Sequence, residues 1–237
     1  CDIRDFTALS EAMSPEENFR FINAYLCQME PVITAHHGFI DKYIGDSIMA
    51  LFPHTADDAV QAAISMMNTL HDYNRGRTRS GDQPIHIGIG INTGTLMLGT
   101  VGGVNRMDGT VISDAVNLAS RLEGLTKLYG ASILVSENTL CGLDDPEHFH
   151  ARFSGRVLLK GKKEIISVFE VFDGESKIQF ERKLTTKQQF NEGLIHYFAK
   201  EFEAAAEAFT AVLQSNPGDT TARLYLDRSQ QFLAHGV

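Results

Sequence analysis

Two short apolar runs separated by a polar turn stand out between Gly38 and Pro53. The runs are Phe39–Ile44 and Ile48–Phe52, and Gly45-Asp46-Ser47 lies between them. Glycine accepts a positive φ and aspartate caps a turn with its own side chain, so the pattern predicts a β-hairpin with an acidic tip. A lone Gly-Asp pair is also typical of an ordinary solvated turn, and only other parts of the chain can decide between the two interpretations.

A long amphipathic helix is predicted before this hairpin. Ser14 is suited to cap it, Pro15 to occupy its first position and Glu17 to close a capping box. Apolar residues then recur at spacings of three or four, which predicts one core-facing side: Phe19, Ile22, Leu26, Met29 and Ile33.

After the hairpin the pattern alternates between helices and strands. A second helix is predicted over Ala56–Tyr73, followed by a polar loop over 74–83. Ile85–Ile91 alternates isoleucine with His and Gly, the period of two that is typical of a strand. Gly94 and Gly99 flank Thr95–Leu98, and Thr100–Gly103 follows, which suggests another hairpin with a glycine-rich end. A third helix is predicted over Asp114–Leu122.

The remaining apolar runs complete one domain over residues 1–173. Strands are predicted at 133–135, 156–159 and 165–172. The order β, α, β, β, α, β is the ferredoxin-like arrangement, so we expect an α+β fold with an antiparallel sheet and helices on one face. Residues 174–186 are charged and aperiodic, which predicts a linker.

The tail, residues 187–237, has a helical pattern only. Gly193, Ala205, Phe209 and Pro217 fall at the offsets of a tetratricopeptide (TPR) repeat, although a plain helical hairpin fits nearly as well. Because one repeat buries its apolar face poorly, we expect this TPR-like extension to pack on the first domain or on a protein partner.

Composition narrows the function classes. The chain has 237 residues, 43% of them hydrophobic, and no apolar run long enough for a membrane span. A formal net charge of −9 argues against a nucleic-acid partner. Cys1, Cys27 and Cys141 are widely spaced, which favours reduced thiols in a cytoplasmic protein. Cys1-Asp2-Ile3 resembles the end of a strand, so we expect a fragment of a longer protein whose other segments decide any membrane attachment.

Three pairs of polar residues need a joint explanation: Asp2 with Asp46, Lys42 with Thr110, and Asn117 with Arg121. Two carboxylates at the ends of neighbouring strands are suitable ligands for one or two Mg²⁺ ions, with positions left for phosphate oxygens. Asn and Arg one helical turn apart offer an amide for a sugar and a cationic fork for a phosphate. Such a set serves phosphoryl or nucleotidyl transfer.

Four stretches, in order, resemble the class III nucleotidyl cyclases, the adenylyl and guanylyl cyclases: CDIRDFTALSE, DKYIGDSIMALF, TVISDAVNLASR and LKGKKE. The resemblance covers residues 1–172. It implies a cyclase homology domain, and it assigns roles to particular residues.

The first of these roles concern metal ions and the triphosphate. Asp2 and Asp46 match the family's two metal-binding aspartates, and Ile3 matches the residue whose backbone carbonyl contacts one ion. The resemblance implies two Mg²⁺ or Mn²⁺ ions in each site. Phe6 and Thr7 belong to the turn whose backbone N–H groups hold the triphosphate at a helix start.

Other roles concern the remaining substrate contacts. Asn117 matches the residue that orients the ribose, Arg121 the one at the reacting α-phosphate, and Lys160 the lysine that reaches the terminal phosphates. Lys42 and Thr110 match the base-selecting pair. No side chain stands out as general base. Each residue alone also fits a structural or solvated role, whereas the full set favours the cyclase interpretation.

The pair Lys42 and Thr110 favours adenine. Adenine offers an acceptor at N1 and a donor at N6, which complement a lysine donor and a threonine oxygen. Guanine reverses this pattern, and the family's guanylyl members carry an acidic residue at the position of Lys42. We expect ATP as substrate, with 3′,5′-cyclic AMP and pyrophosphate as products. The alternatives are a guanylyl cyclase, or a sensing domain that binds a nucleotide or a partner without turnover.

The resemblance also implies a symmetric homodimer with two interface sites. Family members take the metal aspartates from one subunit and the Lys, Thr, Asn and Arg from the other, and this chain carries both sets. Thr110 in place of the commoner Asp marks a subset that includes bicarbonate-stimulated members, so bicarbonate is a candidate activator. Ser113 stands where glycine is usual: a serine suits a helix cap, but a positive φ there would disturb the loop.

Overall fold

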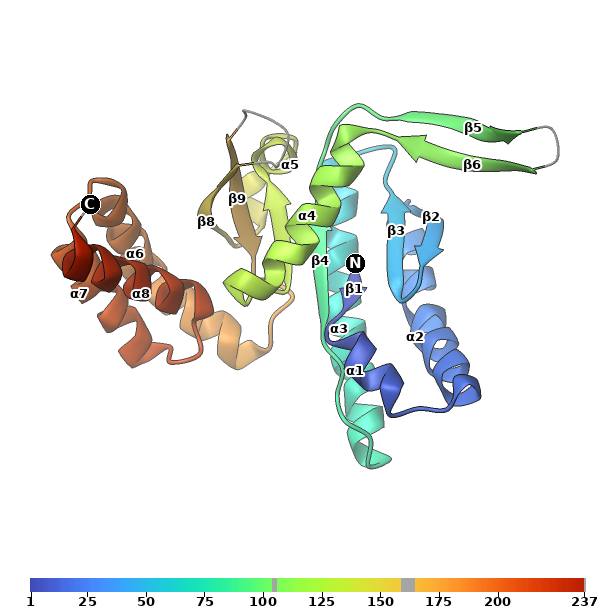
Figure 1. Cartoon of the computed structure of the whole chain (residues 1–237), viewed down its shortest axis with the longest axis horizontal. Coiled ribbons are helices and arrows are strands. Elements are labelled where there is room, and N and C mark those ends of the chain that lie inside the picture. Colours follow the sequence, from blue (N-terminus) through green and yellow to red (C-terminus); the bar gives the residue numbers. More distant parts are fainter. Residues whose placement is uncertain (104–105, 159–164, 237) are drawn as a thin grey trace.

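The computed structural model describes residues 1–103, 106–158 and 165–236. Within these ranges the main sheet has five strands in the order β1-β4-β7-β9-β8 (Figure 1). They are β1 (Asp2–Ile3), β4 (Ile87–Ile91), β7 (Ile133–Ser136), β8 (Ala151–Leu158) and β9 (Ile165–Val171). Strands β4 and β7 are parallel, and the other neighbours pair antiparallel. The predicted α+β class with a mainly antiparallel sheet is confirmed.

The predicted acidic-tipped hairpin is present beside this sheet. It joins β2 (Phe39–Ile44) to β3 (Ser47–Leu51), and Gly45 in its turn takes a φ of 64°, which glycine adopts without steric cost. Backbone groups of Cys1 and Ile48 exchange hydrogen bonds of 2.9 and 3.1 Å. The hairpin therefore continues the sheet past β1.

A second hairpin leaves the body of the molecule as a long ribbon (Figure 1). It consists of β5 (Met97–Gly103) and β6 (Arg106–Ile112), which pair without a break in register. Gly99, one of the two glycines that flank Thr95–Leu98, lies within β5. A side chain at this position would make no packing contact, because a methyl group added to Gly99 would have no neighbour within 4 Å. Glycine therefore costs the strand no packing here.

Helices cover both faces of the sheet, so the prediction of one covered face was wrong. Helices α2 (Pro15–Ala35) and α3 (Ala56–Arg79) share the main apolar core with the isoleucines of β4. Helix α4 (Asp114–Tyr129) lies on the opposite side, in front of β4 in Figure 1. It approaches through Gly90, where a methyl group would lie 2.2 Å from the backbone of α4. Glycines carry no apolar signal, which is why the sequence pattern did not indicate this second packed face.

Helix α2 begins with the predicted capping box. Most of its predicted core side faces the core: Met29 and Ile33 are buried, and Ile22 and Leu26 are partly buried against it. Its buried residues recur at every fourth position: Phe21, Tyr25, Met29 and Ile33. Phe19, predicted in the core, is 72% exposed. Phe21 is buried instead, because helix α1 (Phe6–Glu11) packs beside α2 and its Phe6 ring stacks on Phe21, with the ring centroids 6.3 Å apart.

Helix α3 extends to Arg79, so most of the predicted loop at 74–83 is helical. Asn74 accounts for part of this extension. Its side chain donates to the carbonyl of Ile85 at 2.7 Å and accepts from the Ile85 N–H at 2.8 Å. A polar residue at this helix end therefore fixes the chain that enters β4.

Two short helices connect β7 to β8: α5 (Glu137–Cys141) and the 3₁₀ turn η1 (Pro146–His148). The Ser136 side chain caps α5 by accepting from the N–H of Thr139 at 3.2 Å. Throughout the described ranges, no helix is both long and apolar enough to cross a membrane.

The described part of the tail contains three helices: α6 (Lys177–Phe198), α7 (Phe202–Ser215) and α8 (Thr220–His235). Helix α6 begins inside the predicted linker, which corrects that prediction. Its charges are partly structural, because Lys183 is 5% exposed and pairs with Glu170 and Glu175. Gly193 of α6 lets the Phe209 ring of α7 approach closely, as expected for a helical hairpin.

Candidate active site

Asp2 and Asp46, far apart in sequence, meet where β1 passes the tip of the first hairpin. The Ile3 backbone N–H donates to Asp46 Oδ2 at 3.2 Å, and the Ser47 hydroxyl donates to Asp2 Oδ1 at 2.5 Å. Strand pairing holds both segments, because β1 is bonded to β4 on one side and to β3 on the other. The two carboxylates predicted as metal ligands are thus brought together.

The electrostatics of this acidic pair fit a divalent cation. Partial burial and then the negative charge of Asp2 raise the pKa of Asp46 to about 6. Two carboxylates that disfavour each other's ionisation gain free energy when a cation with oxygen preference binds between them. In the described ranges no cluster of three or more His, Cys, Asp or Glu side chains forms a metal site. An ion here would therefore take further ligands from the backbone, solvent or substrate.

Lys42 owes its orientation to an irregularity in β2. The register pairs Ile40 with Ala50 and Lys42 with Met49, so Asp41 is an extra residue that forms a β-bulge. A bulge re-aims the side chains that follow it. The Lys42 ammonium lies 3.2 Å from Asp41 Oδ2.

Thr110 lies on the other hairpin. Its backbone in β6 pairs with Gly99 of β5, and its side chain is not among those described. Lys160 lies outside the described residues. The structure consequently places Lys42 and Thr110 on two separate hairpins. It tests neither the contact of Thr110 with the base nor the contact of Lys160 with the terminal phosphates.

Helix α4 presents Asn117 and Arg121 on its exposed side, while the residues that follow them in sequence, Leu118 and Leu122, are buried. This is the predicted one-turn spacing on a common face. Ser113 begins the helix: its hydroxyl accepts from the Ala115 N–H at 3.0 Å and donates to the Thr95 carbonyl at 2.6 Å. Ser113 has a φ of −166°, so the loop does not require glycine.

The turn at residues 4–7 precedes α1. Asp5 has a φ of 54°, a left-handed conformation that aspartate tolerates better than most residues. The Phe6 ring packs in the core, so this residue offers its backbone rather than its side chain to a ligand. Thr7 is exposed.

Sequence reasoning missed a connection beneath the site between β1 and α4. The Arg4 guanidinium donates to the Ala131 carbonyl at 3.2 Å and lies 4.0 Å from the Glu123 carboxylate. Gly88 makes room for it, since a methyl group there would lie 2.8 Å from Arg4 Nη2. Burial and then the charge of Asp2 raise the pKa of Glu123. No local sequence pattern marks this partly buried pair.

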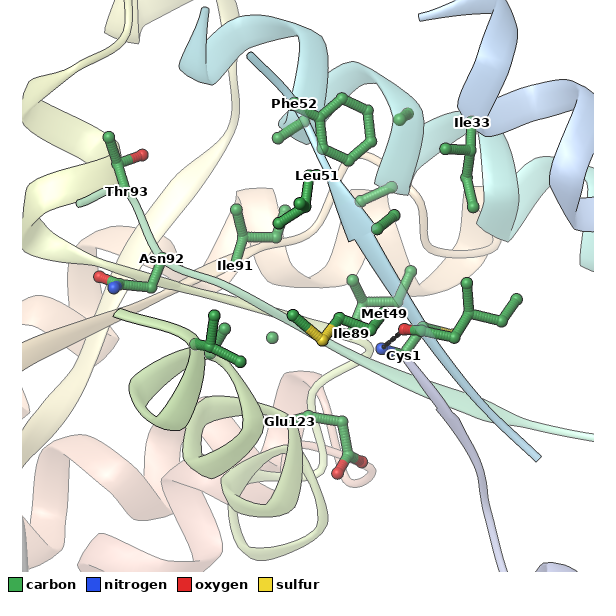
Figure 2. Close-up of a pocket in the computed structure, with 18 of the residues that line it drawn as sticks. Cys1, Ile33, Met49, Leu51, Phe52, Ile89, Ile91, Asn92, Thr93 and Glu123 are labelled. Carbon is green, nitrogen blue, oxygen red and sulfur yellow. Dashed lines mark hydrogen bonds between the residues drawn. The ribbon is translucent and has the colours of Figure 1, made fainter. Parts of the chain in front are cut away.

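A cavity of about 530 Å³ adjoins the acidic pair, between β3, β4 and α4. Figure 2 shows Met49, Leu51, Ile89 and Ile91 along its walls, with Glu123 of α4 near one end. A triphosphate needs cations and N–H donors, whereas this lining is mainly apolar. We therefore locate the candidate site at the acidic pair and the exposed side of α4, not in the cavity.

The structure is an α+β domain with two carboxylates at a strand–hairpin junction and with Asn and Arg on one helix. These features are typical of the class of domains that convert nucleotides at an acidic site. A sequence profile described as "Adenylate and Guanylate cyclase catalytic domain" matches residues 1–170. The chain belongs to this family.

Two curated relatives carry adenylate cyclase names. The chain is 51% identical over 177 residues to "Adenylate cyclase" of Anabaena cylindrica, which covers 72% of this chain and 35% of the relative. It is 38% identical over 236 residues to "Adenylate cyclase, terminal-differentiation specific" of Dictyostelium discoideum, covering 97% of this chain and 11% of the relative. The chain thus spans only a minor part of either relative.

Solved structures support the same fold. The crystal structure of the guanylyl cyclase Cya2 superposes with a TM-score of 0.62 at 35% identity, covering 72% of this chain and 87% of that structure. The chain is therefore similar both to proteins named adenylate cyclase and to a guanylyl cyclase. The choice between ATP and GTP rests on individual residues.

Proposed function

We propose that this chain is an adenylyl cyclase domain that converts ATP to 3′,5′-cyclic AMP and pyrophosphate in signal transduction. The observation that carries this proposal is the acidic pair of Asp2 and Asp46, in a chain that also presents Asn117 and Arg121 on one exposed helical side. We assign the catalytic unit to residues 1–173. The reaction is an in-line attack of the ribose 3′-oxygen on the α-phosphate.

Different residues of this chain have different roles in the reaction. Asp2, Asp46 and the Ile3 carbonyl would hold two divalent ions, Mg²⁺ or Mn²⁺, which when bound supply positive charge for the attacking oxygen and the leaving pyrophosphate. Asn117 orients the ribose. Arg121 stabilises the charge that grows on the α-phosphate.

The remaining contacts bind and select the nucleotide. The backbone at Phe6 and Thr7 and the side chain of Lys160 hold the triphosphate. Lys42 donates to adenine N1 and Thr110 accepts from the N6 amino group. The bulge at Asp41 supports this role of Lys42, because it sets the side chain apart from the regular alternation of β2.

We further propose a symmetric homodimer with two interface sites. Exposed apolar side chains on both hairpins support it: Ile44 is 61% exposed and Met97 76% exposed. Such side chains gain free energy when a second copy covers them. We also propose that bicarbonate activates the enzyme, since Thr110 marks the subset of the family that includes bicarbonate-stimulated members. The TPR-like tail is proposed to bind a protein partner.

The decisive test offers ATP and GTP as rival substrates with Mg²⁺ or Mn²⁺ and separates the cyclic products by chromatography. We expect cyclic AMP as the main product, at least about a hundredfold loss in Asp46→Asn, and a shift toward cyclic GMP in Lys42→Glu. Asp72→Asn, which alters an exposed aspartate paired with Arg75, is the matched control and should keep full activity.

Three outcomes would contradict the proposal. Cyclic GMP as main product of the unaltered chain would make it a guanylyl cyclase. Full activity in Asp46→Asn would remove the metal role of the acidic pair. Nucleotide binding without either product would favour the sensing alternative.

A further inference from the structure

The tail contacts the catalytic domain at the end of helix α4. The Thr221 hydroxyl of α8 donates to the Tyr129 carbonyl in the last turn of α4 at 2.8 Å. Gly130 ends α4 with a φ of 59°, and a methyl group there would lie 2.3 Å from Thr220 Oγ1. The start of α8 thus satisfies a carbonyl that a helix end leaves without an intrahelical donor. The opposed helix termini also have complementary partial charges.

The same helix reaches strand β8 one turn later. The register of β8 passes from Phe153 directly to Gly155, so Ser154 is a bulge residue whose carbonyl accepts from the Tyr225 hydroxyl at 2.9 Å. Gly155 has a φ of 158°, and a methyl group there would lie 2.5 Å from Tyr129 Oη and 2.9 Å from Tyr225 Oη. Helix α4, strand β8 and helix α8 therefore meet at one point.

A buried ionic cluster fixes α8 at this point. Arg152 of β8 donates to both oxygens of Asp219, at 2.6 and 3.0 Å, and to Glu170 of β9 at 2.6 Å. Asp219 also caps α8 by accepting from the Ala222 N–H at 3.0 Å. Because buried charges tolerate few arrangements, this cluster holds α8 in one register on the sheet.

Apolar packing continues the contact along α4. Leu224 of α8 packs on the cluster that contains Leu118, Leu122 and Tyr129 of α4. Leu118 and Leu122 directly follow Asn117 and Arg121 in sequence, about 100° further round the same helix. A displacement of α8 would therefore shift the buried side of α4, and with it the exposed side.

We propose that the tail is a positioning element of the active site, and that Thr221 and Tyr225 are positioning residues that act through α4 and β8. This inference rests on the proposed cyclase function for its catalytic consequence. Its structural part is independent of that function: the tail determines the placement and the rigidity of α4. The tail would then be a required part of the enzyme, also where it binds a protein partner.

The test uses the full chain with a Thr221→Val/Tyr225→Phe double variant, which removes two hydroxyls and little volume. Ser229→Ala is the matched control, because Ser229 is equally buried on α8 and donates to Tyr225 within the helix. We expect about a fivefold to tenfold lower kcat in the double variant, with little change in the KM for ATP. Amide hydrogen exchange in the last turn of α4 should be faster than in the control.

Tyr225→Phe alone should show a smaller decrease in kcat and a smaller increase in α4 amide exchange. This single variant keeps the test decisive if the double variant fails to fold. The inference is overturned if kcat and α4 exchange in the double variant equal those of Ser229→Ala. If the unaltered chain makes no cyclic product, the proposed function fails, whereas the exchange comparison still decides whether the tail positions α4.

Discussion

At the scale of single residues, Arg152 is the cation that compensates two buried carboxylates. Its side chain is buried with Glu170 and Asp219, and it lies over the Phe190 ring at 4.3 Å. Removing one partner from a buried ion pair leaves the other charge without compensation, at a cost of about 3–5 kcal/mol. Arg152→Met should lower the free energy of unfolding by this amount, measured by denaturant titration.

An exposed arginine is the control for this substitution. Arg20 pairs with Glu16 on the surface of α2, so Arg20→Met should change the stability little. Equal, small effects of both substitutions would mean that the Arg152 cluster contributes no net stability.

The same cluster sets a pH dependence. Burial alone would raise the pKa of Glu170, but the positive charges of Arg152 and Lys183 outweigh it and the pKa is lowered; Arg152 likewise lowers the pKa of Asp219. A carboxyl group with a lowered folded-state pKa contributes its full stability above its ordinary value, 4.5 for Glu170 and 3.8 for Asp219. This contribution is lost as the pH falls below those values, through the lowered folded-state pKa. The stability difference between the unaltered chain and Arg152→Met should therefore shrink between pH 7 and pH 3.

At the scale of elements, strand β4 is the platform that places α4. A methyl group on Gly90 would lie 2.2 Å from both the Ala119 carbonyl oxygen and the Glu123 N–H nitrogen, which are backbone atoms that side-chain rotation cannot move. Gly90→Ala should lower the free energy of unfolding by about 1–3 kcal/mol and reduce cyclase activity, because α4 must shift.

A glycine elsewhere gives the comparison for Gly90. Gly76 lies in the interior of α3 with no neighbour within 4 Å of an added methyl group. Gly76→Ala should raise the free energy of unfolding by up to about 1 kcal/mol, since alanine favours helix. A Gly90→Ala chain as stable and active as Gly76→Ala would show that the close approach of α4 is not required. Thermal unfolding and initial rates measure both.

Element positions show what the sequence could and could not predict. Periodicity and turn chemistry predicted the acidic hairpin, the capped start of α2, the strand at β4 and the one-turn spacing of Asn117 and Arg121. These features are local. The second packed face at Gly90 was missed because it depends on the absence of a side chain. The buried role of Lys183 was missed because its pairing with Glu170 of the preceding strand, β9, follows no helical or strand period.

The candidate site likewise contains features that the sequence predicted and features that it did not. Matching short motifs predicted that Asp2 and Asp46 would meet, and the structure brings them together. The Arg4–Glu123 pair beneath them has no local pattern, since each residue alone resembles a solvated charge. Likewise, nothing in the spacing of the tail indicated that Thr221 contacts the end of α4. Long-range polar contacts require the fold itself.

At the scale of the whole molecule, the proposed dimer makes a prediction that no monomer model shares. If each site combines Asp46 of one subunit with Arg121 of the other, Asp46→Asn and Arg121→Ala chains are inactive alone. Equal mixing gives heterodimers in which one site carries both changes and the other is intact. The mixture should recover about a quarter of the unaltered activity, because half of the dimers are mixed and one of their two sites works.

A second mixture makes this experiment discriminating. Asp2→Asn and Asp46→Asn alter the same half of the site, so their heterodimers have one change in each site and should stay inactive. Subunit exchange is verified with fluorescently labelled chains. No recovery in the first mixture despite exchange would place Asp46 and Arg121 within one subunit's site, and the two hairpins would then have no catalytic reason to meet a second copy. Recovery in the second mixture would mean that Asp2 and Asp46 of one site come from different subunits, which contradicts the proposed division of the site.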